Sequence, residues 1–367
     1  MSVNVPVVPF MDLRPGPDAS AVRSAIQRVI DRGWFILGPE LLAFEEEFAA
    51  EMGGRYAVGV GTGTDAIALL LRALGIGPGD EVITAPVSAA YSALAIMMVG
   101  ARPVFADLDP VRLTLDPRAT EAAITPRTKA IMPVHLYGQA ADMPAIAAIA
   151  AKHRLLIVED ACQAHGATSA GEPVGSYGAG GAFSFYPTKN LGALGDGGAI
   201  VTNDAALADK VKLLRNGGQR NRYLHEEFGV NSRLDEMQAA ILRARLPLLA
   251  GWTARRRALA ARYRTQLTGS SVTVPPECDP GHVYHLFPIL SPDRDRLRAD
   301  LAERGIETLI HYPISLPKQP AMAPTDPAAC PIGARIADQV LSLPLHPQLS
   351  FDDLDRVAEA VTACAPK

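Results

Sequence analysis

Short apolar segments alternate with helical segments from Tyr56 to Thr202, and this alternation restricts the fold more than any other feature of the sequence. The apolar segments lack the polar–apolar alternation of a strand with one exposed face, so they are typical of strands buried on both faces. The segments between them, such as Asp65–Leu74 and Met143–His153, have the length of crossover helices. We therefore predict an α/β fold with a mostly parallel sheet. The expected strands are Tyr56–Val60, Val82–Ala85, Pro103–Ala106, Ala130–Val134, Leu155–Val158, Ala182–Phe185 and Ala199–Thr202.

Two helices are expected before the first strand. The first is capped by Asp18 or Ser20 and ends at Gly33, where a glycine can stop a helix. The second begins at Pro39 and ends at Gly53.

A smaller unit is expected in the last third of the chain. The helical stretches Ala205–Leu214 and Leu234–Leu267 precede it, and we expect Pro247 to kink or divide the longer one. We place the domain boundary near Gly251, which gives a large domain of residues 1–250 and a small α/β domain of residues 251–367. The elements expected in the small domain are strands Val283–Leu290 and Glu307–His311 and helices Arg294–Arg304, Ile332–Val340 and Phe351–Cys364.

The charge of the chain argues against two classes of partner. Lys and Arg number 35 and Asp and Glu 39, so the formal net charge is −4 and there is no general attraction for nucleic acid or an anionic membrane. The uncharged stretch Val82–Ala101 is interrupted by Pro86 and Gly100, which favours strand, turn and buried helix over a membrane span. The four cysteines form no C-x-x-C pair, and the first residues lack a signal-peptide pattern. We therefore predict a cytoplasmic protein without a metal site.

Lys189 lies in unusual surroundings for a lysine. It belongs to the apolar, glycine-rich segment FSFYPTKNLGALGDGGA between two expected strands. Desolvation disfavours an ammonium, so an amine held there has a lowered pKa and can form an imine with a carbonyl. A surface lysine in a turn is the alternative, and it is slightly favoured when the residue is taken alone.

Asp160 is expected at the carboxyl end of the strand that begins at Leu155, which is where open parallel sheets bind ligands. Gln163 and His165 follow closely, and both could hydrogen-bond a substituent of a bound ring. An aspartate that caps a helix or closes a turn is the alternative.

The run GTGTD at residues 61–65 directly follows a strand and opens a helix. Small residues let a phosphate approach the N–H groups at a helix N-terminus, and threonine hydroxyls can donate as well. The same run fits part of a dinucleotide-binding fingerprint, G-x-G-x-x-A. That interpretation requires an acidic residue at the end of the next strand, whereas Asp80 and Glu81 precede it.

These three features together are the parts of a pyridoxal phosphate site. The lysine would hold the cofactor aldehyde, and the glycine-rich turn would bind the phosphate. The aspartate would keep the ring nitrogen protonated, which makes the ring an electron sink.

Motifs spread over nearly the whole chain resemble those of the DegT/DnrJ/EryC1/StrS nucleotide-sugar aminotransferases. They are GWFILGP at residues 33–39, GTDA at 63–66, VEDACQAHG at 158–166, FSFYPTKN at 183–190, GVNSRLD at 229–235, HYP at 311–313 and SLPLHP at 342–347. The resemblance implies the aspartate-aminotransferase fold (type I), with a mostly parallel sheet sandwiched by helices and a smaller α/β C-terminal domain.

The resemblance also implies roles for single residues around the cofactor. Lys189 would be the Schiff-base lysine and would carry protons between the donor and acceptor carbons. Asp160 would pair with the pyridinium, and Gln163 would contact the ring hydroxyl. The residues that would hold the phosphate are Gly63, Thr64 and Ser184.

Other implied roles concern the partner subunit and the substrate. Asn231 would reach the phosphate of the neighbouring subunit, which implies a homodimer with shared active sites. The residues expected near the sugar are Trp34, Tyr186, His311 and Tyr312. Relatives usually stack an aromatic residue on the cofactor ring after the Val82–Ala85 strand; here Ala89 holds that position, and Tyr91 is the nearest aromatic residue.

These roles predict an aminotransferase that moves the amino group of L-glutamate to a keto-sugar linked to a nucleotide. The GWFILGP motif most resembles relatives that aminate C3 of a dTDP-linked 3-keto-6-deoxyhexose, and C4 of a dTDP-, UDP- or GDP-linked 4-keto-sugar is the alternative. Relatives with histidine in place of the lysine catalyse a dehydration, so Lys189 favours a transaminase. Two other classes stay open, namely an NAD-dependent oxidoreductase and a catalytically silent regulatory relative.

Overall fold

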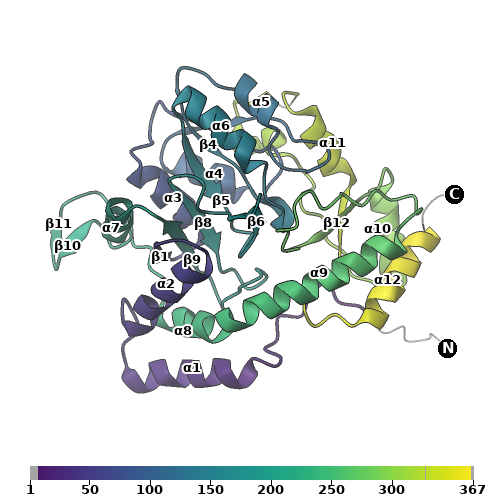
Figure 1. Ribbon diagram of the computed structural model, residues 1–367, viewed down its shortest axis with the longest axis horizontal. Coiled ribbons are helices and arrows are strands. Elements are labelled where there is room, and N and C mark those ends of the chain that lie inside the picture. The colour runs from purple at the N-terminus through teal and green to yellow at the C-terminus, as the bar shows by residue number, and fades with distance from the viewer. Residues whose placement is uncertain (1–6, 327, 365–367) are drawn as a thin grey trace.

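A seven-stranded sheet forms the centre of the computed structural model, which describes residues 7–326 and 328–364 (Figure 1). The strand order is β1–β9–β8–β5–β4–β2–β3. The strands are β1 Tyr56–Val60, β2 Glu81–Thr84, β3 Arg102–Phe105, β4 Thr128–Met132, β5 Leu156–Asp160, β8 Gly180–Ser184 and β9 Gly198–Thr202. Neighbouring strands pair in parallel except at β9, which runs opposite to β1 and β8. The predicted mostly parallel sheet is therefore confirmed, and each of its seven expected strands is present to within two residues.

Helices cover both faces of this sheet, which explains why its strands are apolar throughout. In β9, Ile200 packs with Val211 of α7 on one face, whereas Val201 packs with Phe48 of α2 on the other. Because successive strand residues point to opposite faces, both positions must be apolar. The helices of this part of the chain are α1 Ala19–Arg32, α2 Pro39–Glu51, α3 Gly63–Ala73, α4 Tyr91–Met98, α5 Pro117–Ala122, α6 Met143–His153 and α7 Ala205–Leu214.

A buried carboxylate fixes the start of α2. Glu236 is 0% exposed, and its two oxygens accept hydrogen bonds from the backbone N–H groups of Gly38, Glu40 and Leu41 at 2.8–2.9 Å. These groups lie at the N-terminus of α2, where they have no acceptor in their own helix and where negative charge is favoured. A Cβ atom on Gly38 would lie 2.7 Å from a Glu236 oxygen, so this position requires glycine.

The long helical stretch expected at Leu234–Leu267 is divided, as the proline in it suggested. Helix α8 covers Glu236–Arg245, a short 3-10 turn covers Leu246–Leu248, and α9 covers Leu249–Gln266. In Figure 1 the two helices run below the sheet toward the C-terminal elements, with α1 beneath them. The domain boundary near Gly251, which lies inside α9, stays a prediction.

The C-terminal elements pack around their own apolar cluster, which includes Tyr263 of α9, Phe287 and Leu343. Two predictions were wrong here, and the strand expected at Val283–Leu290 begins only at Phe287. The segment Glu307–His311 is not a strand, because its one bridge joins Leu309 to Ser342; a bridge to Val8 is made by Ile306, just before the segment. The helix expected to end at Val340 ends at Gln339, and Val340 begins a strand that was not predicted. The elements are β12 Phe287–Leu290, α10 Arg294–Glu303, α11 Pro331–Gln339, β13 Val340–Leu343 and α12 Phe351–Cys364.

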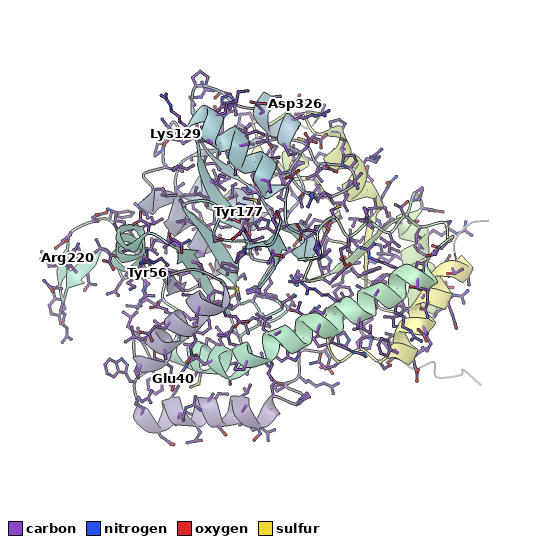
Figure 2. The ribbon with its side chains drawn as sticks, viewed as in Figure 1. Glu40, Tyr56, Lys129, Tyr177, Arg220 and Asp326 are labelled. Atoms are coloured by element: carbon purple, nitrogen blue, oxygen red, sulfur yellow. The ribbon has the colours of Figure 1, made fainter. Side chains whose placement is uncertain are left out.

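A two-stranded hairpin, β10 Gln219–Asn221 and β11 Leu224–His225, projects away from the sheet. Figure 2 shows Arg220 at its outer end, far from the labelled Tyr177 near the centre of the view. Tyr223 and Phe228 beside it are 80% and 77% exposed. In the part of the chain that the structure describes, no helix combines the length and apolarity needed to span a bilayer.

We expect Glu236→Ala to lower the free energy of unfolding by about 3 kcal/mol, because three buried N–H groups lose a charged acceptor. Urea unfolding followed by circular dichroism measures this change. Glu46→Ala is the matched control, because Glu46 is an exposed residue of α2, the helix that Glu236 caps. It should leave the unfolding midpoint nearly unchanged. Equal midpoints for the two variants would contradict the capping role of Glu236.

Candidate active site

Asp160 is the last residue of β5 and lies at the carboxyl edge of the parallel strands. It is 5% exposed. Its Oδ2 accepts a hydrogen bond from the Ser92 hydroxyl at 2.6 Å, and its Oδ1 accepts one from the Cys162 backbone N–H at 3.2 Å. Each oxygen can accept a further bond, so the carboxylate is held in place and can still pair with a bound group.

Gln163 is oriented by two tyrosines. Its Oε1 accepts a hydrogen bond from the backbone N–H of Tyr137 at 2.8 Å, and its Nε2 donates to the Tyr312 hydroxyl at 3.1 Å. The Tyr137 hydroxyl in turn donates to the carbonyl of His311. The carbonyl of Gln163 is thereby engaged, and the amide nitrogen keeps one N–H for a ligand.

Lys189 lies in the connection between β8 and β9 and is half-buried. Desolvation lowers the pKa of its amine, and the neighbouring Asp160 and Cys162 oppose this effect. Burial raises the pKa of the Cys162 thiol well above its usual range, so this thiol is neutral near pH 7. Asp160 therefore supplies the negative charge near the lysine.

The N-terminus of α3 meets the end of β8. Thr62 caps the helix by accepting a hydrogen bond from the Asp65 N–H at 3.0 Å. The N–H groups of Gly63 and Thr64 lie in the first turn and have no acceptor in their own helix. A Cβ atom on Gly63 would lie 2.6 Å from the Cβ atom of Ser184, so only glycine allows this close approach. The arrangement places helix N–H groups beside the Ser184 side chain, as an anion site requires.

His311 and Tyr312 approach this site from the C-terminal part of the chain. The Nδ1 atom of His311 lies 3.0 Å from the Ser342 hydroxyl. Desolvation lowers the pKa of His311 to about 4, and the charge of Lys189 acts in the same direction. Desolvation raises the pKa of Tyr312 to about 12. Both side chains are therefore neutral near pH 7.

Lys189 also lines a surface hollow together with Arg256 and His346. Asp160, Gln163 and Ser184 do not line this hollow, so it lies on another side of the lysine from the cluster above. Thr188 lies between this hollow and a second one, which His285 and His311 line.

His165 was expected to contact a bound ring, and this prediction is wrong. The imidazole is 0% exposed and packs against Phe48, Phe183 and Phe185. Within the described residues, neither ring nitrogen has a hydrogen-bond partner of normal geometry. Desolvation lowers its pKa to about 3. His165 is therefore a neutral core residue beneath the site.

Three of the expected residues differ from this buried cluster because they are exposed in the single chain. Trp34 is 55% exposed and donates from Nε1 to the carbonyl of Ile36 at 2.7 Å. Tyr186 is 52% exposed, although its backbone carbonyl accepts a hydrogen bond from the Lys189 N–H. Asn231 is exposed at the base of the projecting hairpin. Their predicted roles in substrate binding and in a neighbouring subunit stay predictions.

Two residues that contact the site were missed from the sequence. Ser92 bonds the Asp160 carboxylate across a separation of 68 residues, and no local pattern marks such a contact. Tyr137 has a left-handed backbone with φ of 62°. The following Gly138 was the one available signal of a sharp turn there.

Chemically, the site combines a desolvated amine, a buried carboxylate, an oriented amide and an anion-binding helix N-terminus. This donor set fits a phosphorylated ring that carries an aldehyde and a basic ring nitrogen. The lowered pKa of Lys189 makes the amine available as a nucleophile and as a proton carrier.

Comparison with known proteins finds one family across the whole site. The model of the DegT/DnrJ/EryC1/StrS aminotransferase family matches residues 18–362. The dTDP-3-amino-3,4,6-trideoxy-alpha-D-glucose transaminase of Streptomyces venezuelae is 49% identical over 370 residues, which cover 99% of this chain and 97% of that protein. The erythromycin biosynthesis sensory transduction protein EryC1 of Saccharopolyspora erythraea is 47% identical, over 98% of this chain and 100% of that one.

A solved structure resembles the fold closely. The crystal structure of S. venezuelae DesV in complex with a ketimine intermediate superimposes with a TM-score of 0.95 at 49% identity, covering 99% of both chains. The expected aspartate-aminotransferase fold of type I is thereby confirmed.

We expect His165 to make the protein less stable as the pH falls. Its pKa is about 3 in the folded state and 6.5 when unfolded, so the unfolded chain binds the additional proton between these values. The stabilisation from the neutral imidazole is complete above pH 6.5 and is lost as the pH falls, at about 1.4 kcal/mol per pH unit.

Urea unfolding between about pH 7 and about pH 4.5 tests this expectation. His165→Leu should reduce the slope of unfolding free energy against pH by that amount. Phe48→Leu, in the same aromatic cluster, should lose stability without a change of slope. Parallel curves for His165→Leu and the wild type would contradict the burial of a neutral imidazole.

Proposed function

Because this chain belongs to the DegT/DnrJ/EryC1/StrS aminotransferase family, we propose that it aminates C3 of a dTDP-linked 3-keto-6-deoxyhexose with L-glutamate as the amino donor. The chain is a sugar aminotransferase by its family. The observation that carries the proposed transaminase chemistry is the meeting of Lys189, Asp160 and the N-terminus of α3 in one place.

Pyridoxal 5'-phosphate is the cofactor that we propose for this site. The N–H groups of Gly63 and Thr64 and the Ser184 hydroxyl would hold its phosphate. Asp160 would face its ring nitrogen, and the free N–H of Gln163 would donate to its ring hydroxyl. When bound, the cofactor supplies an aldehyde carbon that carries the amino group and a protonated ring that withdraws electrons.

Lys189 has the properties of the general acid and base for the proton transfers. Its desolvated amine has a lowered pKa, so it can release and take up a proton near working pH. Asp160 holds a negative charge opposite the ring nitrogen. Tyr312 is neutral and fixed by Gln163, so its hydroxyl keeps its proton and can donate it toward the substrate.

The name of the Streptomyces relative supports the choice of sugar and of carbon, since it describes a 3-amino sugar linked to dTDP. The GWFILGP motif of residues 33–39 points to the same class. Its Trp34, Phe35 and Ile36 are 55%, 50% and 40% exposed in the single chain. We propose that they, and Asn231, are completed by a second copy of the chain in a homodimer with shared active sites.

Two other functions are less well supported. A nicotinamide nucleotide would need an acidic residue at the carboxyl end of β2, but Glu81 lies at the amino end of this strand. Its carboxylate is also paired with Arg102 and Arg127, at 2.6 and 2.7 Å. A regulatory role is suggested by the name of EryC1, a sensory transduction protein. Lys189, the candidate nucleophile and proton carrier, favours a catalyst over that role.

An absorption spectrum tests the proposed chemistry. The purified protein with pyridoxal phosphate should show a violet-region band that bleaches on addition of L-glutamate. In a separate sample without glutamate, borohydride should reduce the lysine imine and fix the cofactor covalently to the wild type. Lys189→Ala should lose at least about 95% of that yield, because the nucleophile that forms the imine is removed. Lys129→Ala, at the exposed position labelled in Figure 2, should be trapped like the wild type. Undiminished trapping in Lys189→Ala would refute the assignment.

A panel of keto-sugar nucleotides tests the substrate. We expect 2-oxoglutarate to form with kcat/KM about tenfold or more higher for the dTDP-linked 3-keto sugar than for 4-keto sugars linked to dTDP, UDP or GDP, because binding and positioning differ at the reacting carbon. Faster reaction with a 4-keto sugar would contradict the C3 assignment while leaving the transaminase chemistry intact.

A further inference from the structure

Two buried serines form a hydroxyl chain that ends on the carboxylate of Asp160. Ser88 and Ser92 are 3% and 2% exposed. Their Oγ atoms lie 2.8 Å apart, and the Ser92 Oγ lies 2.6 Å from Asp160 Oδ2. Both serines come from the segment that runs from the end of β2 to the first turn of α4.

The direction of the hydrogen bonds in this chain follows from the number of protons. A carboxylate can only accept hydrogen bonds, so Ser92 donates its single hydroxyl proton to Asp160. Ser88 must then be the donor to Ser92. Each bond polarises the next, so the Ser88 hydroxyl strengthens the bond that Ser92 gives to the carboxylate.

This arrangement acts on the group that we place opposite the cofactor ring nitrogen. Asp160 already accepts a backbone bond from Cys162 on its other oxygen. Every hydrogen bond donated to a carboxylate stabilises its ionised form over its neutral form. In a site where one proton is shared between a carboxylate and a pyridine nitrogen, such bonds keep the proton on the nitrogen.

We propose that Ser92, assisted by Ser88, is a positioning residue whose hydrogen bond holds the Asp160 carboxylate toward the ring nitrogen and thereby favours a proton on that nitrogen. This inference rests on the proposed function, since it requires pyridoxal phosphate in the site. In this proposal the two serines help the cofactor ring to withdraw electrons, and they do not bind the substrate.

A purely structural role for the hydroxyls is the alternative, and the chain offers a matched comparison. Thr84 of β2 is 0% exposed, and its hydroxyl donates to the carbonyl of Met132 at 3.0 Å. It is therefore a buried hydroxyl in the same part of the fold, bonded to backbone and not to Asp160. Loss of that hydroxyl removes a buried hydrogen bond without changing the carboxylate.

The test uses the holoenzyme loaded with pyridoxal phosphate labelled with ¹⁵N in the ring, because the ¹⁵N chemical shift reports protonation of that nitrogen directly. Ser92→Ala should move the signal toward that of a neutral pyridine and raise the dissociation constant of the cofactor about tenfold, the loss expected for one hydrogen bond to a charged group. Ser88→Ala should move the signal less and in the same direction. Ser92→Thr, which keeps the hydroxyl, should restore the wild-type signal.

Thr84→Val should leave the ¹⁵N signal unchanged. The proposal is overturned if Ser92→Ala, or Ser88→Ala where the first variant does not fold, gives the signal of the wild type and of Thr84→Val. A wild-type protein that retains no labelled cofactor would overturn the proposed function, and this inference with it. Retention of the label with no effect of either serine would overturn this inference alone.

Discussion

The site depends on a desolvated amine that lies within the electrostatic influence of a buried carboxylate. Burial of Lys189 disfavours its charged form, and Asp160 partly restores it. Opposing effects of this kind bring the affinity of an amine for its proton toward the working range of an acid–base catalyst. Either effect alone would fail, because an exposed lysine stays protonated near pH 7 and a buried lysine without a counter-charge stays neutral.

The sheet supplies the geometry for this pairing. Asp160 ends β5, Ser184 ends the neighbouring strand β8, and both strands run in the same direction, so their carboxyl ends share one edge. The N-terminus of α3 arrives at this edge, and the close approach at Gly63 allows its N–H groups to face the same space. Because β9 is antiparallel to its neighbour β8, the loop that joins them lies at the carboxyl end of β8. Lys189 belongs to this loop and is therefore held at the same edge of the sheet.

The sequence predicted the seven strands of the sheet and the place of Asp160 at a strand end, because hydrophobic periodicity is a local property. The roles assigned to Lys189 and Asp160 stay predictions. The sequence failed where long-range contacts decide. The segment Glu307–His311 has a strand-like pattern, but it makes only one bridge. His165 lies two residues beyond Gln163 in the same motif, and only the packing of Phe48, Phe183 and Phe185 shows that it faces the core. Ser92 became visible only when folding brought α4 to β5.

The imidazoles around Lys189 add a last constraint on the chemistry. Desolvation lowers the pKa values of His165, His285 and His311, and in each case the charge of Lys189 lowers it further. With folded-state pKa values of about 3 for His165 and about 4 for His311, these rings bind a proton far more weakly than an amine does. Transfer of a proton from Lys189 to one of these rings is therefore unfavourable. The surrounding rings keep the proton on the lysine or on the substrate, which suits a catalyst in which one amine both removes and returns the proton.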